Sequence, residues 1–388
     1  MKINFYNTPQ PAAFDAALIK DKPNFIDYRP DFALMDRLTK QFEDKEHVIV
    51  VGHGGSITSS VGIYSALRSS ARTQMHFVST IDPDYIAAIK SFASKDNSLV
   101  IAISKSGETV TQIEALMQFI DYPMLIVTGV AGPLSEIAAK LNSTQVIHPP
   151  IGGRFSGFSE VGLLPIALAG INAKEIYDAG QKYLQQFQSN NPAYEAASIL
   201  YQLEQQGIAD VFLPIYSEEL FPYSNLIIQL CHESFGKDGK GQTYFAHRAP
   251  ESQHHTNQRF FGGQKNIAGW FIGDMRSDNM LVTKIPESLS NVPLKTSTLN
   301  LLDGIPLQSA MQFEREATLE DAKLQNIPVV DMMLETVDHK DVGEFMAFWQ
   351  LYAVYASCMR GVDPYNQPQV EASKKISFAK RQQFKGSL

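Results

Sequence analysis

Short apolar runs that end in glycine- and serine-rich loops constrain the fold of this chain most strongly. Residues 47–51 form such a run before the loop 52–56 (GHGGS), and residues 98–103 form another before the loop 104–109 (SKSGET). A pattern typical of a helix follows each loop. Strands that are apolar throughout are typical of parallel sheets covered on both faces. The repeated order of strand, loop and helix therefore predicts an α/β fold with a doubly wound parallel sheet.

The same alternation continues along the chain, and 388 residues are too many for one ordinary domain. Strands are expected over 47–51, 75–78, 98–103, 124–128, 144–147, 209–213, 242–246, 268–273 and 329–333. Helices are expected over 57–67, 110–120, 133–141, 159–169, 193–206, 219–235, 306–325, 341–359 and 368–382. We predict two three-layer αβα domains, over 46–185 and 190–362, with an N-terminal helical arm over 1–45 and a C-terminal helical tail over 363–388.

Composition and charge limit which binding partners and which cellular compartment we expect. The formal net charge is −8 and there is no long basic run, which argues against nucleic acid and anionic membrane as partners. Cys231 and Cys358 stand in apolar, helix-like settings, so we expect no disulfide framework and a cytoplasmic location. The N-terminus lacks a signal-peptide pattern and no run of 18 apolar residues occurs, so we expect no membrane span.

The loops 52–56 and 104–109 have the composition of a phosphate-binding site. Backbone N–H groups at a helix N-terminus favour anions, hydroxyl groups add donors, and glycine lets the backbone approach a ligand closely. Both loops should lie at the carboxyl edge of one sheet, which favours a phosphate pocket over simple N-capping. Neither loop has the Walker A or the GxGxxG spacing. We expect His53 to be structural.

The expected helix over 219–235 carries a candidate base. Gln229 and Glu233 are four residues apart, so they lie on one helical face. A carboxylate beside an amide on a rigid element suits a catalytic base with a polar neighbour that positions substrate. The alternative is an exposed Glu and Gln pair on an amphipathic helix.

Two other segments carry candidate groups. Arg154 follows two glycines, which leave room for a ligand to reach a guanidinium suited to a developing oxyanion. A surface arginine is the alternative. The segment 247–258 holds three histidines, and its spacing matches no compact zinc signature, so acid–base use of one imidazole is preferred and no metal is expected.

Six short motifs, in order, resemble the phosphoglucose isomerase family of the sugar isomerase (SIS) domain superfamily. They are GGS at 54–56, SKSGET at 104–109, GGRFS at 152–156 with VGLLP at 161–165, QxxxESxGK at 229–237, QHxxxQ at 253–258 and QxxVExxK at 367–374. The resemblance covers about 50–375 and implies two SIS-type domains with a tail that completes the active site. The chain departs from the family pattern at His53 and Gln369, His255 lies beside His254, and the chain is short.

The resemblance also implies a reaction and a role for each residue. The reaction would interconvert glucose 6-phosphate and fructose 6-phosphate through a cis-enediolate, in glycolysis and gluconeogenesis. Glu233 would be the base, Arg154 would stabilise the enediolate, and His254 would open the sugar ring with help from Lys374. The substrate-binding residues would be Gly55, Ser56, Ser104, Lys105, Ser106 and Thr109 at the phosphate, and Gln229 and Gln367 at the hydroxyls.

The resemblance further implies a homodimer in which His254 is donated across the interface, and no metal or organic cofactor. Two alternatives remain open. A dual phosphoglucose/phosphomannose isomerase is less well supported, because the segment 159–165 (SEVGLLP) differs from the threonine-rich site expected there. A non-catalytic sugar-phosphate sensor could lose Glu233, Arg154, His254 or Lys374, and all four are present.

Overall fold

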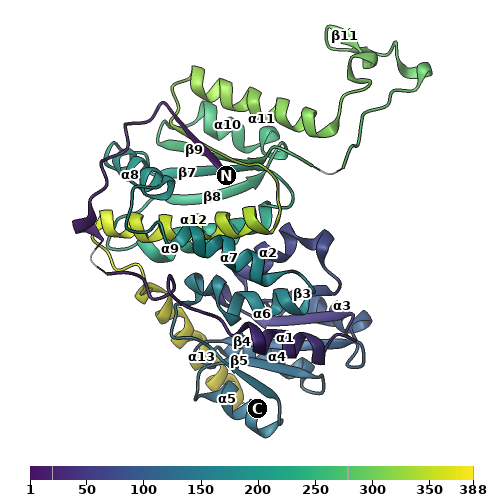
Figure 1. The fold of residues 1–388 in the computed structure, drawn as a ribbon, viewed down its shortest axis with the longest axis vertical. Coiled ribbons are helices and arrows are strands. Elements are labelled where there is room, and N and C mark those ends of the chain that lie inside the picture. The colour runs from purple at the N-terminus through teal and green to yellow at the C-terminus, as the bar shows by residue number, and fades with distance from the viewer. Residues whose placement is uncertain (20, 278, 388) are drawn as a thin grey trace.

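The computed structural model describes residues 1–19, 21–277 and 279–387. Two five-stranded sheets lie on either side of a shared layer of helices (Figure 1). The largest apolar core occupies this shared layer and includes side chains from both sheets. The two halves are therefore joined by one continuous core.

The first sheet has the strand order β3-β2-β4-β5-β6, and all its paired strands are parallel. Its strands are β2 (His47–Gly52), β3 (Gln74–Val78), β4 (Ser98–Ser104), β5 (Met124–Thr128) and β6 (Thr144–Ile147). Because the chain crosses over at β2, the sheet is wound in both directions. The predicted doubly wound parallel sheet is confirmed.

Successive residues of a strand in this sheet face opposite layers. In β2, Val48 and Val50 belong to the shared core, whereas Ile49 and Val51 belong to a separate outer core. The shared side is covered by α1 (Phe32–Gln41), α2 (Thr58–Ala66) and α6 (Glu160–Leu168). The outer side is covered by α3 (Pro83–Phe92), α4 (Val110–Leu116) and α5 (Pro133–Lys140). Covering on both faces explains why these strands are apolar throughout.

The second sheet has the order β1-β12-β9-β7-β8. Its four parallel strands are β7 (Asp210–Tyr216), β8 (Thr243–Arg248), β9 (Ile267–Asp274) and β12 (Val329–Leu334). Helices α8 (Pro192–Gln205), α9 (Ser224–Phe235) and α12 (His339–Arg360) cover its inner face, and α7 (Ala173–Leu184) packs against α12 within the shared layer. Helices α10 (Thr256–Gly262) and α11 (Leu307–Leu324) cover the outer face.

The N-terminal segment differs from the prediction. Lys2–Tyr6 form β1, which pairs antiparallel with β12, so the prediction of a helical arm is wrong for these residues. The alternation of Ile3 and Phe5 with polar neighbours is the pattern of a half-buried strand, and the strand gains its partner only in the folded molecule. Helix α1 lies within the same segment, and the Asp31 side chain caps it by accepting from the N–H of Leu34.

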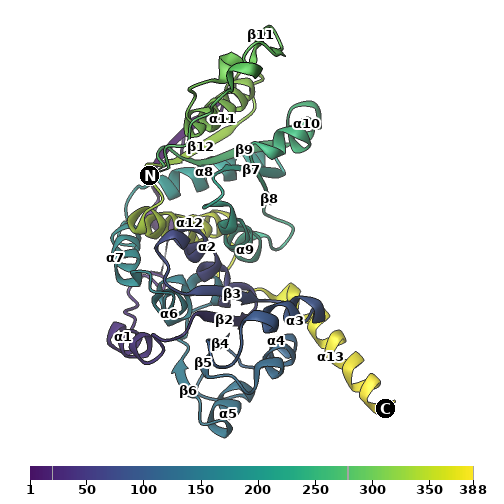
Figure 2. The ribbon, with the colours of Figure 1, turned by 90° about the vertical axis from the view of Figure 1, so that its right-hand side faces the viewer.

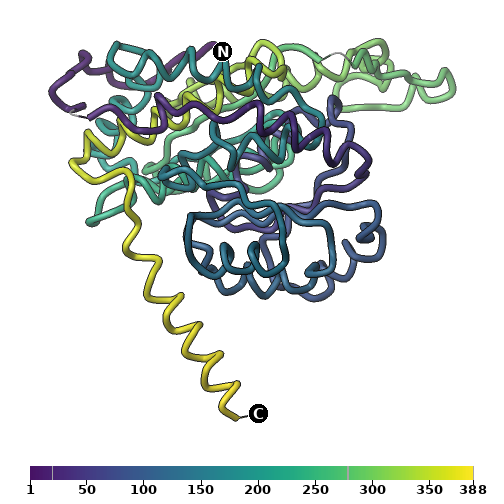
Figure 3. Tube along the Cα trace, turned by 60° about the horizontal axis from the view of Figure 1, so that its bottom comes forward, coloured from purple at the N-terminus to yellow at the C-terminus, as the bar shows by residue number. Residues whose placement is uncertain are grey.

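Two segments extend from the body, as Figures 2 and 3 show. One is the excursion between β9 and α11, which includes β10 (Pro293–Leu294) and β11 (Ser297–Thr298). The other is the C-terminal helix α13 (Glu371–Gly386), which was predicted and which buries none of its residues. Short 3-10 helices in these and other connections are Ala16–Leu18, Arg68–Ser70, Met117–Phe119, Phe221–Tyr223, Glu287–Leu289, Leu299–Leu302 and Pro368–Val370. None of the helices in the described ranges is long and apolar enough to span a bilayer.

Candidate active site

The GGS turn packs directly against the turn that carries Arg154. Residues Gly54–Ser56 and Gly153–Phe158 each form a short 3-10 helix. A Cβ atom at Gly55 would lie 2.2 Å from the carbonyl carbon of Gly153 and 2.3 Å from the backbone nitrogen of Arg154. Only glycine allows this approach. The close contact brings the end of β2 to Arg154, which comes almost a hundred residues later in the chain.

The two predicted phosphate loops lie side by side at the carboxyl edge of the first sheet. Strands β2 and β4 are neighbours, and the Gln112 amide joins their ends by donating to the carbonyl oxygens of Val51 (2.9 Å) and Ile103 (2.8 Å). The His53 Nε2 and Thr111 Oγ1 atoms are 3.1 Å apart. Burial lowers the pKa of His53. His53 therefore ties the first loop to the first turn of α4, which follows the second loop.

Serine hydroxyl groups shape the second loop. Ser104 Oγ accepts from the N–H of Gly107 (3.1 Å), and Ser106 Oγ accepts from the N–H of Glu108 (3.3 Å). Each hydroxyl accepts here and still has its own proton to donate to an anion. Lys105 is exposed, and Thr109 precedes the first residue of α4.

Gln229 and Glu233 project from one face of α9 and contact each other. The Gln229 Nε2 donates to Glu233 Oε1 (3.1 Å), and Thr58 Oγ1 donates to Gln229 Oε1 (3.0 Å). A Cβ atom at Gly54 would lie 3.0 Å from Gln229 Nε2, so the pair adjoins the GGS turn. The Glu233 side chain is 29% exposed. Its carboxylate is thus held by neighbours and still accessible to a ligand.

Arg154 is buried and joins the remaining groups. Its Nη1 donates to Glu233 Oε2 (3.0 Å) and to Gln367 Oε1 (2.9 Å), and its Nε donates to Ser234 Oγ (2.9 Å). The Nη2 atom donates to the backbone carbonyls of Glu233, Pro364 and Asn366. Burial lowers the pKa of Arg154, and the Glu233 carboxylate opposes that shift. We call Arg154, Gln229, Glu233 and Gln367 the central cluster.

Two of the predicted residues lie apart from the central cluster. His254 is exposed at the end of a 3-10 helix (Glu251–His254), and Lys374 is exposed on α13 and pairs with Glu371 (2.7 Å). In the described part of the chain, no side-chain hydrogen bond joins either of them to Glu233 or Arg154. Figure 2 shows α13 leading away from the body. The neighbouring His255 caps α10, since its Nδ1 accepts from the N–H of Thr256 (2.7 Å).

Several supporting residues had no role assigned from the sequence. Ser234 and Lys237 lie inside the QxxxESxGK motif, and their place in that motif was the one sequence feature that could have pointed to a role for them. Thr58 and Gln112 gave no signal, because each acts through a contact with a distant segment. Among the described residues, no three His, Cys, Asp or Glu side chains converge as metal ligands would. Cys231 and Cys358 are both free.

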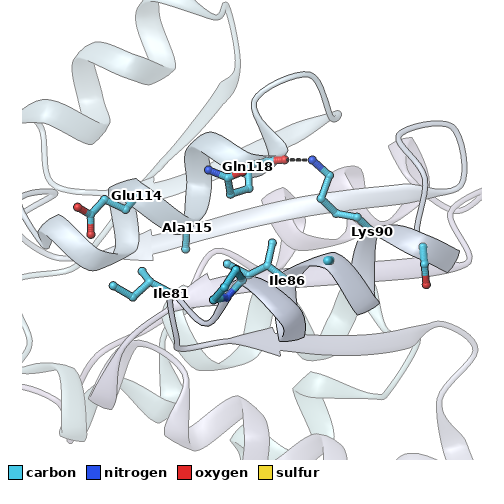
Figure 4. Close-up of a pocket in the computed structure, with 9 residues that line it drawn as sticks. Ile81, Ile86, Lys90, Glu114, Ala115 and Gln118 are labelled. Atoms are coloured by element: carbon cyan, nitrogen blue, oxygen red, sulfur yellow. Dashed lines mark hydrogen bonds between the residues drawn. The ribbon is translucent and has the colours of Figure 1, made fainter.

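A groove of about 700 Å³ lies between α3 and α4 on the outer face of the first sheet (Figure 4). It is lined by Ile81, Pro83, Ile86, Ala87, Lys90, Ser91, Glu114, Ala115 and Gln118. No member of the central cluster lines it, and within it Lys90 is engaged with the carbonyl oxygen of Gln118 (2.7 Å). The groups suited to proton transfer therefore gather elsewhere.

Comparison with known proteins agrees with this arrangement. A sequence model of the family "Phosphoglucose isomerase" matches residues 36–387. A probable glucose-6-phosphate isomerase of Natronomonas pharaonis is 29% identical over an alignment of 353 residues that covers 86% of this chain and 78% of that protein. A glucose-6-phosphate isomerase of Rubrobacter xylanophilus is 24% identical over 96% of this chain and 92% of that protein.

Solved structures share the fold. A hypothetical protein of Thermus thermophilus superposes with a TM-score of 0.82 at 23% identity and covers 94% of this chain and 92% of its own. A glucose-6-phosphate isomerase of Chlamydia trachomatis gives a TM-score of 0.77 at 18% identity, over 98% of this chain and 82% of its own. The family match spans the first sheet, the four parallel strands of the second sheet, the central cluster and the C-terminal helix, and the chain therefore belongs to the phosphoglucose isomerase family.

Proposed function

We propose that this chain is an aldose–ketose isomerase that interconverts glucose 6-phosphate and fructose 6-phosphate. The observation that carries the proposal is the 3.0 Å contact between the Glu233 carboxylate and the Arg154 guanidinium. It sets a base beside a permanent positive charge, next to loops suited to a phosphate group. The family membership and the names of the relatives point to the same reaction.

Glu233 acts as the base that moves a proton between C2 and C1. A proton α to a carbonyl is weakly acidic, so its removal needs a fixed base and a positive group at the forming oxyanion. Gln229 and Arg154 each hold one carboxylate oxygen of Glu233, which fixes its direction. Arg154 then stabilises the cis-enediolate, since its charge does not depend on pH in the working range.

The phosphate group is bound by the loops 52–56 and 104–109, with Gly55, Ser56, Ser104, Ser106 and Thr109 as contacts and Lys105 as a nearby cation. Support comes from the position of both loops at one edge of the sheet and from hydroxyl protons that remain to be donated. Because the phosphate is remote from the reacting carbons, its binding energy holds the sugar in place. Gln229 and Gln367 contact the sugar hydroxyl groups.

Ring opening is assigned to His254, with Lys374 assisting. Both side chains are exposed and apart from the central cluster of their own chain. This separation favours a homodimer in which His254 enters the active site of the partner subunit, as the family resemblance implies. Lys374 would reach the sugar through a change in the position of α13. We further propose a cytoplasmic enzyme of glycolysis and gluconeogenesis that needs no metal or organic cofactor.

The test is a coupled assay with glucose 6-phosphate and mannose 6-phosphate side by side, each with and without EDTA. We expect turnover of glucose 6-phosphate that EDTA leaves unchanged, and much slower turnover of mannose 6-phosphate. Equal turnover of both sugars would indicate the dual isomerase instead. No turnover of either sugar would indicate a sensor, and a loss of activity with EDTA would contradict metal independence.

A further inference from the structure

Lys237 is a buried lysine whose side chain is held by oxygen atoms of one short segment of the chain. It follows the end of α9 and is 7% exposed. Its Nζ atom donates to the backbone carbonyls of Asp363 and Asn366 and to Asn366 Oδ1 (3.0 Å). Among the described residues, no salt bridge includes Lys237. Burial and the nearby Arg154 charge lower the pKa of Lys237, and the Asp363 carboxylate opposes that shift. A buried ammonium group is costly unless it is well hydrogen-bonded, so the carbonyl contacts matter for this side chain.

The acceptors of Lys237 all belong to one short segment, residues 363–367, which we call the strap. The strap lies between α12 and the 3-10 helix Pro368–Val370 that precedes α13. It is also bound by Arg154, whose Nη2 donates to the carbonyls of Pro364 and Asn366. Two cations from different parts of the chain therefore hold the same turn through its carbonyl oxygens.

The strap ends in Gln367, which belongs to the central cluster. Gln367 Oε1 accepts from Arg154 Nη1 at 2.9 Å, the same nitrogen that contacts Glu233. If the strap moves, Gln367 leaves and one side of the Arg154 guanidinium loses its partners. The Asp363 carboxylate stiffens the strap from within, because it accepts from the Tyr365 N–H (2.8 Å) and from Asn366 Nδ2 (2.7 Å).

We propose that Lys237 is a positioning residue for the isomerase reaction. It locks the strap so that Gln367 and Arg154 keep their places beside the base. This inference depends on the proposed function, because the strap has a catalytic consequence only if Arg154 and Glu233 carry out the reaction. The phosphate loops are formed by other segments, so Lys237 should affect catalysis and leave phosphate binding intact.

The same loop offers a matched control in Lys240. Its Nζ donates to the carbonyl of Arg360 (2.7 Å), just before the strap, so it too ties the loop after α9 to the end of α12. Unlike Lys237 it is exposed, and among the described residues no side-chain hydrogen bond or salt bridge joins it to residues 363–367. A general role in holding the C-terminal segment would be shared by both lysines, whereas positioning of Gln367 belongs to Lys237 alone.

The experiment compares Lys237→Met, Lys237→Arg and Lys240→Met in the full-length chain. We expect Lys237→Met to lower kcat for glucose 6-phosphate by about ten- to a hundredfold, the loss typical of a misplaced reacting group. The inhibition constant for inorganic phosphate should stay within about twofold of the wild type, since a catalytic loss need not alter ground-state binding. Lys237→Arg should recover part of kcat, and Lys240→Met should behave as the wild type.

Amide hydrogen exchange supplies a readout apart from activity. Peptides covering residues 363–370 should exchange faster in Lys237→Met than in the wild type or in Lys240→Met. If Lys237→Met fails to fold, Asn366→Ala removes one of the same contacts and should lower kcat in the same direction. An unchanged kcat in the folded variants, or equal losses in Lys237→Met and Lys240→Met, would overturn the inference. An inactive wild type would overturn the proposed function instead.

Discussion

At the scale of single residues, the Arg154 guanidinium determines the geometry of the central cluster. Its three nitrogens reach a carboxylate, an amide oxygen, a hydroxyl and backbone carbonyls. A planar fork of five donors suits this set of acceptors, which a lysine could not serve from one position. Glu233 is thereby held between a neutral amide on one oxygen and a cation on the other.

The phosphate assignment leads to a prediction for Ser104 and Thr109. The double substitution Ser104→Ala with Thr109→Ala should mainly raise KM for glucose 6-phosphate, because phosphate contacts exist in the ground state and in the transition state alike. Steady-state kinetics would measure this, with Ser94→Ala as a control at an exposed serine outside both loops. A fall in kcat with KM unchanged would contradict the assignment.

At the scale of elements, the helix α9 was the part of the site that the sequence predicted best. The spacing of Gln229 and Glu233 predicts one shared face, and the 3.1 Å bond between them confirms it. The spacing of residues along the sequence could not predict which side chains contact Glu233. Arg154 and Gln367 are 79 and 134 residues from Glu233 along the chain, and only the path of the folded chain brings them together. The family resemblance, not periodicity, indicated that they belong to one site.

The contact between the GGS turn and the Arg154 turn gives a second prediction. Gly55→Ala would place a methyl group against backbone atoms of Gly153 and Arg154, so the two turns must separate. Overpacking of this kind typically costs about 1–3 kcal/mol. We expect a lower Tm and a large loss of kcat/KM.

Gly152→Ala is a control at the start of the Arg154 turn, because the nearest atom to its added methyl group would be a Phe155 ring carbon at 4.0 Å. Its Tm should stay close to that of the wild type. Equal Tm values for the wild type and Gly55→Ala would contradict the close approach of the two turns.

At the scale of the whole molecule, the two sheets share one core, and this explains where prediction succeeded and where it did not. Buried parallel strands such as β2 and β4 can be predicted from their continuous apolar composition. Strand β1 could not be predicted in this way, because it is a partly exposed edge strand whose partner β12 lies more than three hundred residues away along the chain. The domain limits over 46–185 and 190–362 remain predictions, as does the role of the tail in completing the site.

The proposed homodimer predicts complementation between two inactive variants. Glu233→Gln and His254→Asn should each be at least about a hundredfold less active alone. If His254 enters the partner's site, a mixed dimer has one site with both native residues. Coexpression in equal amounts should then restore roughly a quarter of wild-type turnover, since about half of the dimers formed at random are mixed. A mixture no more active than its parents would contradict an exchanged histidine.

The most direct test of the account is the turnover of Glu233→Gln with glucose 6-phosphate, measured together with its affinity for inorganic phosphate. The substitution keeps the size of the side chain and removes the base. We expect kcat to fall by about a hundred- to ten-thousandfold, while the inhibition constant for phosphate remains near the wild-type value. Turnover close to that of the wild type would contradict the claim that the carboxylate on α9 transfers the proton.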